Sequence, residues 1–484
     1  MISSNSDWQL NRTTERIMLM LILAGGALLY FWDLDRTSLW LDEAYSVHQS
    51  HRGFFDMLAQ TARDNYPPLH NVILWPVVKL FGFSETAVRF PSAVMAVVAV
   101  YSIYRLGKCV WNAAEGLIAA LLLAIQPIFV WHAGEARMYP LLCLVAIGFM
   151  WATVAHFKHK TRRSAMIAGM TGFLLLMSHI FGSLLFASVN VFIVLAFLRK
   201  RAWRDDRFQS WLTWQVVAML AFLPWIIVLA GRANHAVSDG FWIPYPSIDY
   251  LQNLLAWLLT LPLIWTGAAL LVLAVAQRLW RHYRGTTPDQ QYALPGNTVW
   301  LFTVWLLGPL AIGYILSVLA VPILQSRYLI CSFPAVALLI AHGIGSLPVP
   351  VMVRTAIPLL IAALILPQAI DRATTSVGER HDMRAAIAEI NRQAEPGDHY
   401  QLHPRYFEPL FGYYKHNDPN KRSSTKAWDD SSPFPAGARV WLFVADDGRA
   451  AETSILDSYR ALGYRLETSR RFNRLTVHEL DSRP

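Results

Sequence analysis

Long uncharged runs of hydrophobic residues alternate with short polar connections from the N-terminus to about residue 370. A helix needs about 20 apolar residues to cross the hydrocarbon core of a bilayer. The runs that approach this length predict about eleven membrane-spanning helices. Their approximate limits are 17–34, 88–106, 113–131, 138–156, 164–178, 180–198, 210–230, 251–276, 298–320, 328–347 and 355–370.

The pattern changes after Asp371 to that of a water-soluble domain. Ile387 and Ile390 are spaced as on the apolar side of an amphipathic helix, and short β-type runs follow further along the chain. The predicted elements are helices at 383–393 and near 454–462, and strands at 439–444 and near 475–480. We therefore predict a mainly α-helical polytopic transmembrane domain over residues 1–370 and a small α/β domain over residues 371–484.

Composition and charge argue against a soluble protein and against a nucleic-acid-binding protein. Hydrophobic residues make up 55% of the 484 positions and charged residues 15%, whereas soluble proteins carry about 25% charged residues. The formal net charge is +9, but the basic residues gather in alternate connections, as in the cytoplasmic loops of membrane proteins. The clusters contain Arg105 and Lys108; Lys158, Lys160, Arg162 and Arg163; Arg199, Lys200, Arg201, Arg204 and Arg207; and Arg278, Arg281 and Arg284.

This charge pattern predicts the orientation of the chain in the membrane. The basic connections are expected in the cytoplasm, so the N-terminus lies inside, and an odd number of spans places the C-terminal domain outside. The first apolar run has no small-residue cleavage site after it, so we expect an uncleaved anchor. Cys109, Cys143 and Cys331 lie in or beside apolar runs and predict neither a disulfide framework nor a zinc site.

Two adjacent carboxylates, Asp42 and Glu43, follow the first apolar run within SLWLDEAYS at 38–46. Two acids side by side are costly in hydrocarbon, so they face water, a cation or a substrate. An acidic pair in a solvated loop is the plain alternative, but the apolar and aromatic neighbours argue against it. The first outer connection, about 35–87, is also long and amphipathic, and it predicts interfacial helices at 53–62 and 69–81.

Polar and aromatic residues gather in the other outer connections. They are DNYPPLH at 64–70, HAGEARMYP at 132–140, SHIFG at 178–182, FWIPYPSIDY at 241–250 and QSRYL at 325–329. Convergent polar groups in an apolar wall are typical of a binding cleft, and we predict one that includes Tyr66, His70 and His179. His70, His132 and His179 could include metal ligands, but they lack a metal-binding spacing, and interfacial or hydrogen-bonded histidines are the simpler interpretation.

The outer side of a membrane has no pool of nucleotide-activated donors, and the C-terminal domain has no GxGxxG or P-loop spacing. A transfer enzyme there needs a lipid-linked donor, such as a sugar on polyprenyl phosphate. The acceptor hydroxyl must lose a proton as it attacks the anomeric carbon, and a carboxylate such as Asp42 can take it. The leaving phosphate gathers negative charge, which basic side chains stabilise. The candidates are Arg137 and Arg327, with Lys79 and Arg89 behind them.

Each of these residues also has a structural interpretation. Arg137 can form a capping ion pair with Glu135, while Arg327 and Tyr328 can be interfacial anchors, since Arg and Tyr favour that depth. The run HFKHKTRR at 156–163 has the composition of an anion or metal site, but the charge bias of cytoplasmic loops explains it. A divalent metal is possible but has no supporting motif, so no cofactor is predicted with certainty.

Five segments carry a family resemblance: LWLDEAYS at 39–46, NYPPLH at 65–70, LFGFSETAVRFPSA at 80–93, GEARMYPL at 134–141 and SRYL at 326–329. Together they resemble the C-type (GT-C fold) polytopic glycosyltransferases, in the bacterial branch of protein O-mannosyltransferases and lipid A aminoarabinose transferases. The resemblance implies that Asp42 is the catalytic base and that Glu43 supports it or binds the acceptor. It also implies that Arg137, Tyr139, Arg327 and Tyr328 surround the donor phosphate. The C-terminal domain has no WWDYG-like sequence, which argues against oligosaccharide transfer to asparagine.

We therefore predict an inverting membrane glycosyltransferase that moves one sugar from a polyprenyl-phosphate donor to a lipid, glycan or protein acceptor of the cell envelope. The expected location is the bacterial inner membrane, among membrane lipids, with a periplasmic C-terminal domain and no nucleic-acid partner. A membrane transporter or a flippase for lipid-linked sugars is the alternative, although transporters tend to carry ionisable groups within spans. A third interpretation, a membrane anchor that presents the C-terminal domain, leaves the outer segments unexplained.

Overall fold

A computed structural model describes residues 10–64, 66–238, 298–375, 380–395, 397–417 and 438–483, with short stretches between residues 243 and 254. The chain divides into two compact units. The first comprises Met1–Trp32, Phe54–Leu74 and Arg89–Thr374, and the second comprises Asp33–Gly53, Trp75–Val88 and Thr375–Pro484. The second unit therefore combines the segment of the acidic pair with the C-terminal region.

The first unit is helical. Its helices are α1 (Arg12–Tyr30), α3 (Phe54–Thr61), α4 (Leu69–Phe81), α5 (Glu85–Val110), α6 (Ala113–Ala124), α7 (Pro127–Ala133), α8 (Tyr139–His159), α9 (Arg162–Leu176), α10 (Ile180–Arg199), α11 (Asp206–Ser238), α14 (Thr298–Leu319), η2 (Ser326–Ser332), α15 (Phe333–Gly345) and α16 (Val351–Thr374). The helices expected at 53–62 and 69–81 correspond to α3 and α4. The last part of α4 and the first turn of α5 belong to the second unit.

Eight helical segments in the described residues are long and apolar enough to cross a membrane, and α6 with α7, bent by 65°, makes a possible ninth. The protein is therefore a multi-pass membrane protein, as predicted. Helix α9, at 15 residues, is short for a span. Most of the span predicted at 251–276 lies outside the described residues, so the count of about eleven stays a prediction.

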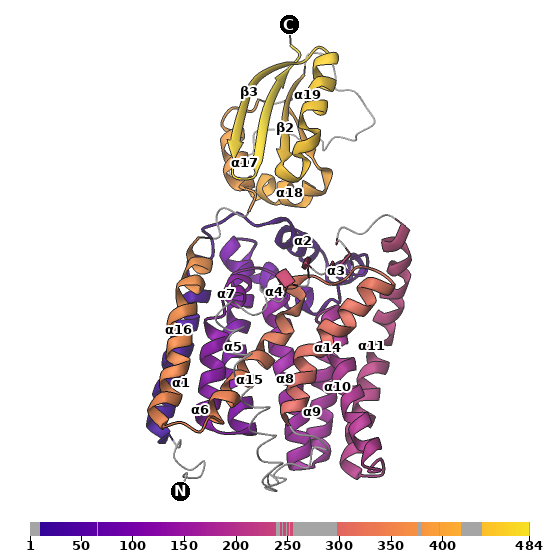
Figure 1. Ribbon diagram of the computed structural model, residues 1–484. Coiled ribbons are helices and arrows are strands. Elements are labelled where there is room, and N and C mark those ends of the chain that lie inside the picture. Colours follow the sequence, from indigo (N-terminus) through magenta and orange to yellow (C-terminus); the bar gives the residue numbers. More distant parts are fainter. Residues whose placement is uncertain are drawn as a thin grey trace. The chain divides into compact units, whose positions relative to one another are not determined.

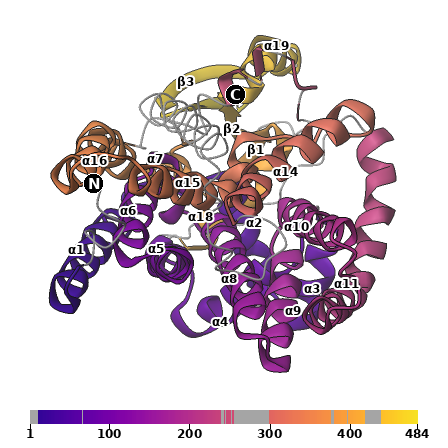
Figure 2. The ribbon, with the colours of Figure 1, turned by 60° about the horizontal axis from the view of Figure 1, so that its bottom comes forward.

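Small residues bring the helices of the first unit close together. A Cβ added at Gly107 of α5 would lie 2.8 Å from the Cα of Gly116 in α6. One added at Gly169 of α9 would lie 2.6 Å from the carbonyl oxygen of Trp214 in α11. Lipid-embedded helices gain from such close backbone approach because hydrocarbon offers them no hydrophobic driving force. Figures 1 and 2 show α1, α6, α7 and α16 grouped on one side of this unit and α9, α10 and α11 on the other.

The predicted basic connections meet at one end of the first unit. The Lys158 ammonium donates to the Cys109 carbonyl at 3.2 Å, which joins the end of α8 to the end of α5. The His156 Nε2 donates to the Arg207 carbonyl at 2.9 Å, which joins the end of α8 to the start of α11. Three of the four basic clusters thus share one side of the bundle, while the cluster at 278–284 lies outside the described residues.

The second unit contains α2 (Leu41–Ser50) and a four-stranded sheet. The other elements are α17 (Met383–Asn391), β1 (His399–His403), η4 (Arg405–Phe407), α18 (Glu408–Asn417), β2 (Arg439–Ala445), η5 (Asp446–Ala451), α19 (Glu452–Ala461), β3 (Arg465–Phe472) and β4 (Leu475–Asp481). The strand order is β1-β2-β4-β3, with β1 parallel to β2 and the other pairs antiparallel. Figure 1 shows α17, α18 and α19 beside this sheet.

The predicted small α/β fold is confirmed for this region. Helices α17 and α19 and strands β2 and β4 match the predicted elements, and Ile387 and Ile390 are buried. Strands β1 and β3 and helix α18 were not predicted. Six of the seven residues of β2 are buried, as expected for a central strand that is covered on both faces. The domain boundary predicted at residue 370 stays a prediction.

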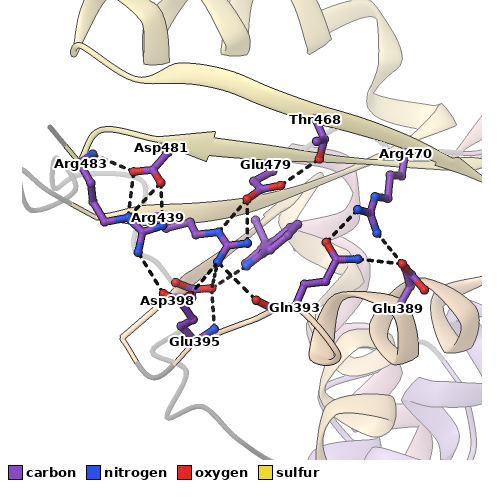
Figure 3. Close-up of polar contacts among 11 residues, drawn as sticks. Glu389, Gln393, Glu395, Asp398, Arg439, Thr468, Arg470, Glu479, Asp481 and Arg483 are labelled. Atoms are coloured by element: carbon purple, nitrogen blue, oxygen red, sulfur yellow. Dashed lines mark hydrogen bonds and ion pairs between the residues drawn. The ribbon is translucent and has the colours of Figure 1, made fainter.

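Ion pairs and hydrogen bonds tie α17 and the following turn to the sheet (Figure 3). The Arg439 guanidinium on β2 lies 2.7 Å from the Glu479 carboxylate on β4 and 3.8 Å from Asp398. The Trp441 indole also donates to Asp398 at 2.9 Å. Arg470 of β3 contacts Glu389 of α17. This network lies within the C-terminal region and contains none of the predicted site residues.

A test of the helix packing replaces Gly169 with alanine. Because its Cβ would meet the Trp214 backbone, Gly169→Ala should lower thermal stability, since overpacking costs about 1–3 kcal/mol. Gly148→Ala is the matched control, because its Cβ would lie 3.9 Å from Thr171 and both variants gain the helix preference of alanine. Size-exclusion chromatography after heating in detergent measures the difference. Equal stability of the two variants would contradict the close contact of α9 with α11.

Candidate active site

The acidic pair lies in the first turn of α2, a helix that was not predicted. Trp40 precedes the helix, and its backbone N–H donates to the Glu43 carboxylate at 3.1 Å. The same carboxylate lies 3.5 Å from the Arg380 guanidinium, and the Glu43 side chain is 0% exposed. Glu43 is thus a buried carboxylate that interacts with both the start of its helix and the C-terminal region.

Asp42 has a different environment from its neighbour. Adjacent helical residues point about 100° apart, since a turn takes 3.6 residues, so the two carboxylates do not share one direction. Asp42 is only partly buried, and its carbonyl accepts a hydrogen bond from the Ser46 hydroxyl at 3.0 Å. The two acids therefore suit different tasks: Asp42 is accessible, and Glu43 is held in place.

The C-terminal region contacts the residues just before α2. The Arg380 guanidinium donates to the Thr37 hydroxyl at 2.9 Å, and the Leu39 N–H donates to the Tyr414 hydroxyl at 2.6 Å. The backbone N–H of Arg384 donates to the Ser38 hydroxyl at 3.0 Å. Arg380, Arg384 and Tyr414 were not predicted as site residues, because no local pattern in a soluble domain distinguishes them.

Lys79 also belongs to the second unit. Its ammonium donates to the His51 carbonyl at 2.7 Å, and His51 follows the last turn of α2. A cation at this end of a helix is favourable because the carbonyl groups there carry partial negative charge. Lys79 thus supports the acidic helix at its far end.

A cluster of tyrosine rings and arginines forms in the first unit. The hydroxyl groups of Tyr66 and Tyr328 lie 2.6 Å apart. The Arg137 guanidinium carbon lies 5.4 Å from the centre of the Tyr66 ring, and that of Arg327 lies 5.7 Å from the Tyr328 ring. Arg137 is buried, and cation–π contacts of this kind are favourable away from water. Four of the predicted residues therefore meet, although Tyr66 and Tyr328 are 262 positions apart.

His179 lies against the same tyrosines. Its ring centre is 4.7 Å from that of Tyr328 and 5.2 Å from that of Tyr66. Its Nδ1 accepts a hydrogen bond from the Phe181 N–H at 3.1 Å. Burial, together with the charges of Arg137 and Arg327, lowers the pKa of His179 to about 3, so the ring is neutral at physiological pH.

The tautomer of His179 follows from these contacts. Because Nδ1 accepts, the single proton of the neutral ring is on Nε2. This Nε2 is fully buried and has no hydrogen-bond partner among the described residues. A buried donor without an acceptor is costly, so it is a candidate to donate to a ligand.

The remaining predicted residues lie around this cluster. The Tyr139 ring centre is 6.4 Å from that of His179. Burial and the charge of Arg137 lower the pKa of His70 to about 3, so this ring is neutral as well. Arg89 is buried on α5, one turn before Ser92, whose hydroxyl donates to the Arg137 carbonyl at 3.2 Å.

His132 and Glu135 form a structural pair next to the cluster. The Glu135 carboxylate accepts from the Trp131 indole at 2.8 Å and lies 2.7 Å from Nδ1 of His132. Within the part of the chain that the structure describes, no group of three or more His, Cys, Asp and Glu residues is placed to hold a metal ion.

A cavity of 970 Å³ lies at the other end of α9, away from His179. Its lining includes Lys160, Arg162, Arg204 and Arg207, which belong to the basic connections. None of the predicted site residues lines it. We therefore base the candidate site on the buried contacts above and not on this open basic hollow.

A family model described as dolichyl-phosphate-mannose-protein mannosyltransferase matches residues 65–228. The matched region contains Tyr66, Arg137 and His179 of the cluster. A comparison of the sequence with curated proteins finds no match.

Solved structures of membrane glycosyltransferases share the fold. The crystal structure of ArnT from Cupriavidus metallidurans in the apo state has a TM-score of 0.61 at 16% identity and covers 97% of this chain and 98% of that chain. ArnT bound to undecaprenyl phosphate has a TM-score of 0.58 at 16% identity, with 95% and 97% covered. The oligosaccharyltransferase AglB from Archaeoglobus fulgidus, in complex with an inhibitory peptide and a dolichol-phosphate, has a TM-score of 0.55 at 13% identity, with 91% and 70% covered. The predicted resemblance to the C-type glycosyltransferases is therefore confirmed, by the family model over residues 65–228 and by the fold over nearly the whole chain.

Proposed function

We propose that this protein is an inverting membrane glycosyltransferase that moves a sugar from a polyprenyl-phosphate donor to a hydroxyl of a lipid, glycan or protein. The observation that carries the proposal is the cluster of Arg137, Arg327 and His179, in which Arg137 and His179 are buried and the fully buried Nε2–H of His179 is a hydrogen-bond donor that a phosphate can accept. The family model and the shared fold support it. ArnT binds undecaprenyl phosphate in one of the matched structures, and AglB is in complex with a dolichol-phosphate in another.

In the proposed reaction, the acceptor oxygen attacks the anomeric carbon from the face opposite the phosphate, so the configuration inverts. As the new C–O bond forms, Asp42 takes the hydroxyl proton, and the electrons of the old bond leave with the phosphate oxygen. General-base help of this kind is worth about 10²–10⁴ in rate. Asp42 suits this role because it is accessible, whereas Glu43 is buried and serves to support it.

The leaving phosphate gains negative charge, which the arginine cluster stabilises in this proposal. The guanidinium groups of Arg137 and Arg327 can pair with phosphate oxygens in a two-pronged geometry. The Nε2–H of His179 donates a further hydrogen bond, as a neutral donor that adds no charge. Tyr66, Tyr139, Tyr328 and His70 supply the walls of the site. Arg89 lies one helical turn before Ser92, whose hydroxyl donates to the Arg137 carbonyl.

The proposed location is the bacterial inner membrane, with the basic connections in the cytoplasm and the C-terminal domain in the periplasm. The meeting of three basic clusters at one end of the helical unit supports this orientation, because positive loops are retained inside. A transporter or a flippase for lipid-linked sugars is not favoured, since the family model and the shared fold point to sugar transfer.

The orientation is tested with fusions to the C-terminus. In bacteria, a phosphatase fused there should be active, because it folds outside the cytoplasm. A fluorescent protein fused there should be dark, because it is then exported from the cytoplasm. The same two reporters inserted after Lys160, in a basic connection, should give the opposite pattern. An active phosphatase after Lys160 and an inactive one at the C-terminus would overturn the orientation.

The role of Asp42 is tested by Asp42→Asn, which keeps the size of the side chain and removes the basic oxygen. Transfer should fall by about 10² or more with normal membrane insertion. Glu43→Gln should cost less, and Asp56→Asn, an exposed acid on α3, should have no effect. Purified variants are assayed with a polyprenyl-phosphate sugar and an envelope extract as acceptor. A folded Asp42→Asn protein with full activity rules out the mechanism.

The phosphate role of the arginines is tested by Arg137→Ala and Arg327→Ala. Each should raise the donor KM or lower kcat by about tenfold or more, since a charge-assisted hydrogen bond is lost. Lysine at either position should restore little, because it cannot form the two-pronged contact. Arg354→Ala is the control, as Arg354 donates to the Leu347 carbonyl away from the cluster. Normal donor kinetics in both alanine variants would disprove the assignment.

A further inference from the structure

We propose that the C-terminal domain positions the catalytic acid, with Arg380, Arg384 and Tyr414 as the contacts that hold the start of α2. This inference rests on the proposed function, in which Asp42 is the general base. The three residues act through the backbone and through Glu43, so they are positioning residues and have no contact with the reacting atoms in this scheme.

Arg380 connects the sheet to the first turn of α2. Its guanidinium lies 3.5 Å from the buried Glu43 carboxylate and donates to the Thr37 hydroxyl. The Asn473 amide, in the turn between β3 and β4, donates to the Arg380 carbonyl at 2.6 Å. A fixed turn of the sheet thus holds the arginine, and the arginine holds Glu43.

Tyr414 of α18 holds the residue before Trp40. Its hydroxyl accepts from the Leu39 N–H at 2.6 Å and donates to the Glu85 carboxylate at 2.9 Å. Both hydrogen-bonding functions of this one hydroxyl are therefore used. Tyr413, the preceding residue, donates to the Phe83 carbonyl, so α18 contacts two separate segments of the second unit.

Arg384 of α17 contacts the segment from Asp35 to Ser38, which precedes α2. Its guanidinium donates to the Asp35 carbonyl at 2.8 Å and to the Arg36 carbonyl at 2.9 Å, while its backbone N–H donates to Ser38. Residues 38–40 belong to no helix or strand, and buried backbone groups need partners. The C-terminal domain supplies several of them.

These contacts determine the direction of Asp42. The helix begins at Leu41. The orientation of its first turn therefore depends on the backbone of residues 35–40 and on the position of the Glu43 side chain. A reacting group displaced by about 1 Å can lose about 10² in rate. A buried ion pair adds little stability compared with apolar packing, but it tolerates few arrangements. Arg380 thus contributes to the orientation of the first turn of α2 and little to the free energy of unfolding.

The test compares Arg380→Gln with Arg439→Gln in the full-length protein. Both variants remove an arginine whose side chain is at most 10% exposed and whose carboxylate partner is at most 13% exposed. Arg439 pairs with Glu479 inside the sheet (Figure 3), and its polar contacts among the described residues are with the C-terminal region. Arg380→Gln should lower kcat by about tenfold or more while the donor KM stays within about twofold, because donor binding is untouched. Arg439→Gln should keep the wild-type kcat.

A second pair of variants separates positioning from folding. If Arg380→Gln does not fold, the double variant Glu43→Gln, Arg380→Gln serves instead, because it leaves no unpaired buried charge. Its kcat should be lower than that of the wild type, since the contact of Arg380 with Thr37 and the charge pair with Glu43 are both lost. Arg380→Lys, which keeps the charge, should recover part of the loss.

The outcomes are distinguishable. A wild-type kcat in folded Arg380→Gln, or in the double variant, overturns the positioning role, and so does an equal loss in Arg439→Gln. If Asp42→Asn is fully active, the proposed function itself fails. If Asp42→Asn is inactive while the Arg380 variants keep the wild-type kcat, only the present inference fails.

Discussion

A charge removed from water must find a partner, and this requirement organises both units of the chain. In the second unit, the Glu43 carboxylate accepts from a backbone N–H and faces Arg380. In the first, an indole and an imidazole contact the Glu135 carboxylate. Arg137 and Arg327 lie over tyrosine rings, whose faces stabilise a cation. The same requirement thus accounts for these contacts in both units.

The fold was predictable where the hydrophobic contrast along the chain is strong. The long apolar runs became helices such as α8 and α10, and the run at 439–444 became the central strand β2. Helix α2 was missed because its sequence, LDEAYSVHQS, is short and of mixed polarity, and contacts with distant residues stabilise it. Strand β3 was missed because it lies at the edge of the sheet and exposes most of its side chains, which removes the alternating pattern.

The sequence allowed the residues of the candidate site to be predicted. It did not allow their contacts with one another to be predicted. Tyr66, Arg137 and His179 stand out in the sequence because they lie in polar connections between apolar runs, where convergent polar groups are typical of a binding cleft. Their grouping depends on tertiary contacts between connections that the sequence separates widely. Arg380 has no such signal, since an arginine in a soluble domain is usually a surface residue, and only its contact with a buried carboxylate 337 positions earlier distinguishes it. Burial, which the sequence does not display, was the missing information.

The distance along the chain between α2 and its partners also has a consequence for biosynthesis. Leu39 and Tyr414 are 375 positions apart, and Thr37 and Arg380 are 343 positions apart. Synthesis proceeds from the N-terminus, so the ribosome completes the acidic helix long before the residues that hold it. Every described candidate span except α1 lies between these partners in the sequence and is therefore made in the interval. The contacts of Glu43 with Arg380 and of Leu39 with Tyr414 therefore form only late in synthesis, after the C-terminal residues have been made.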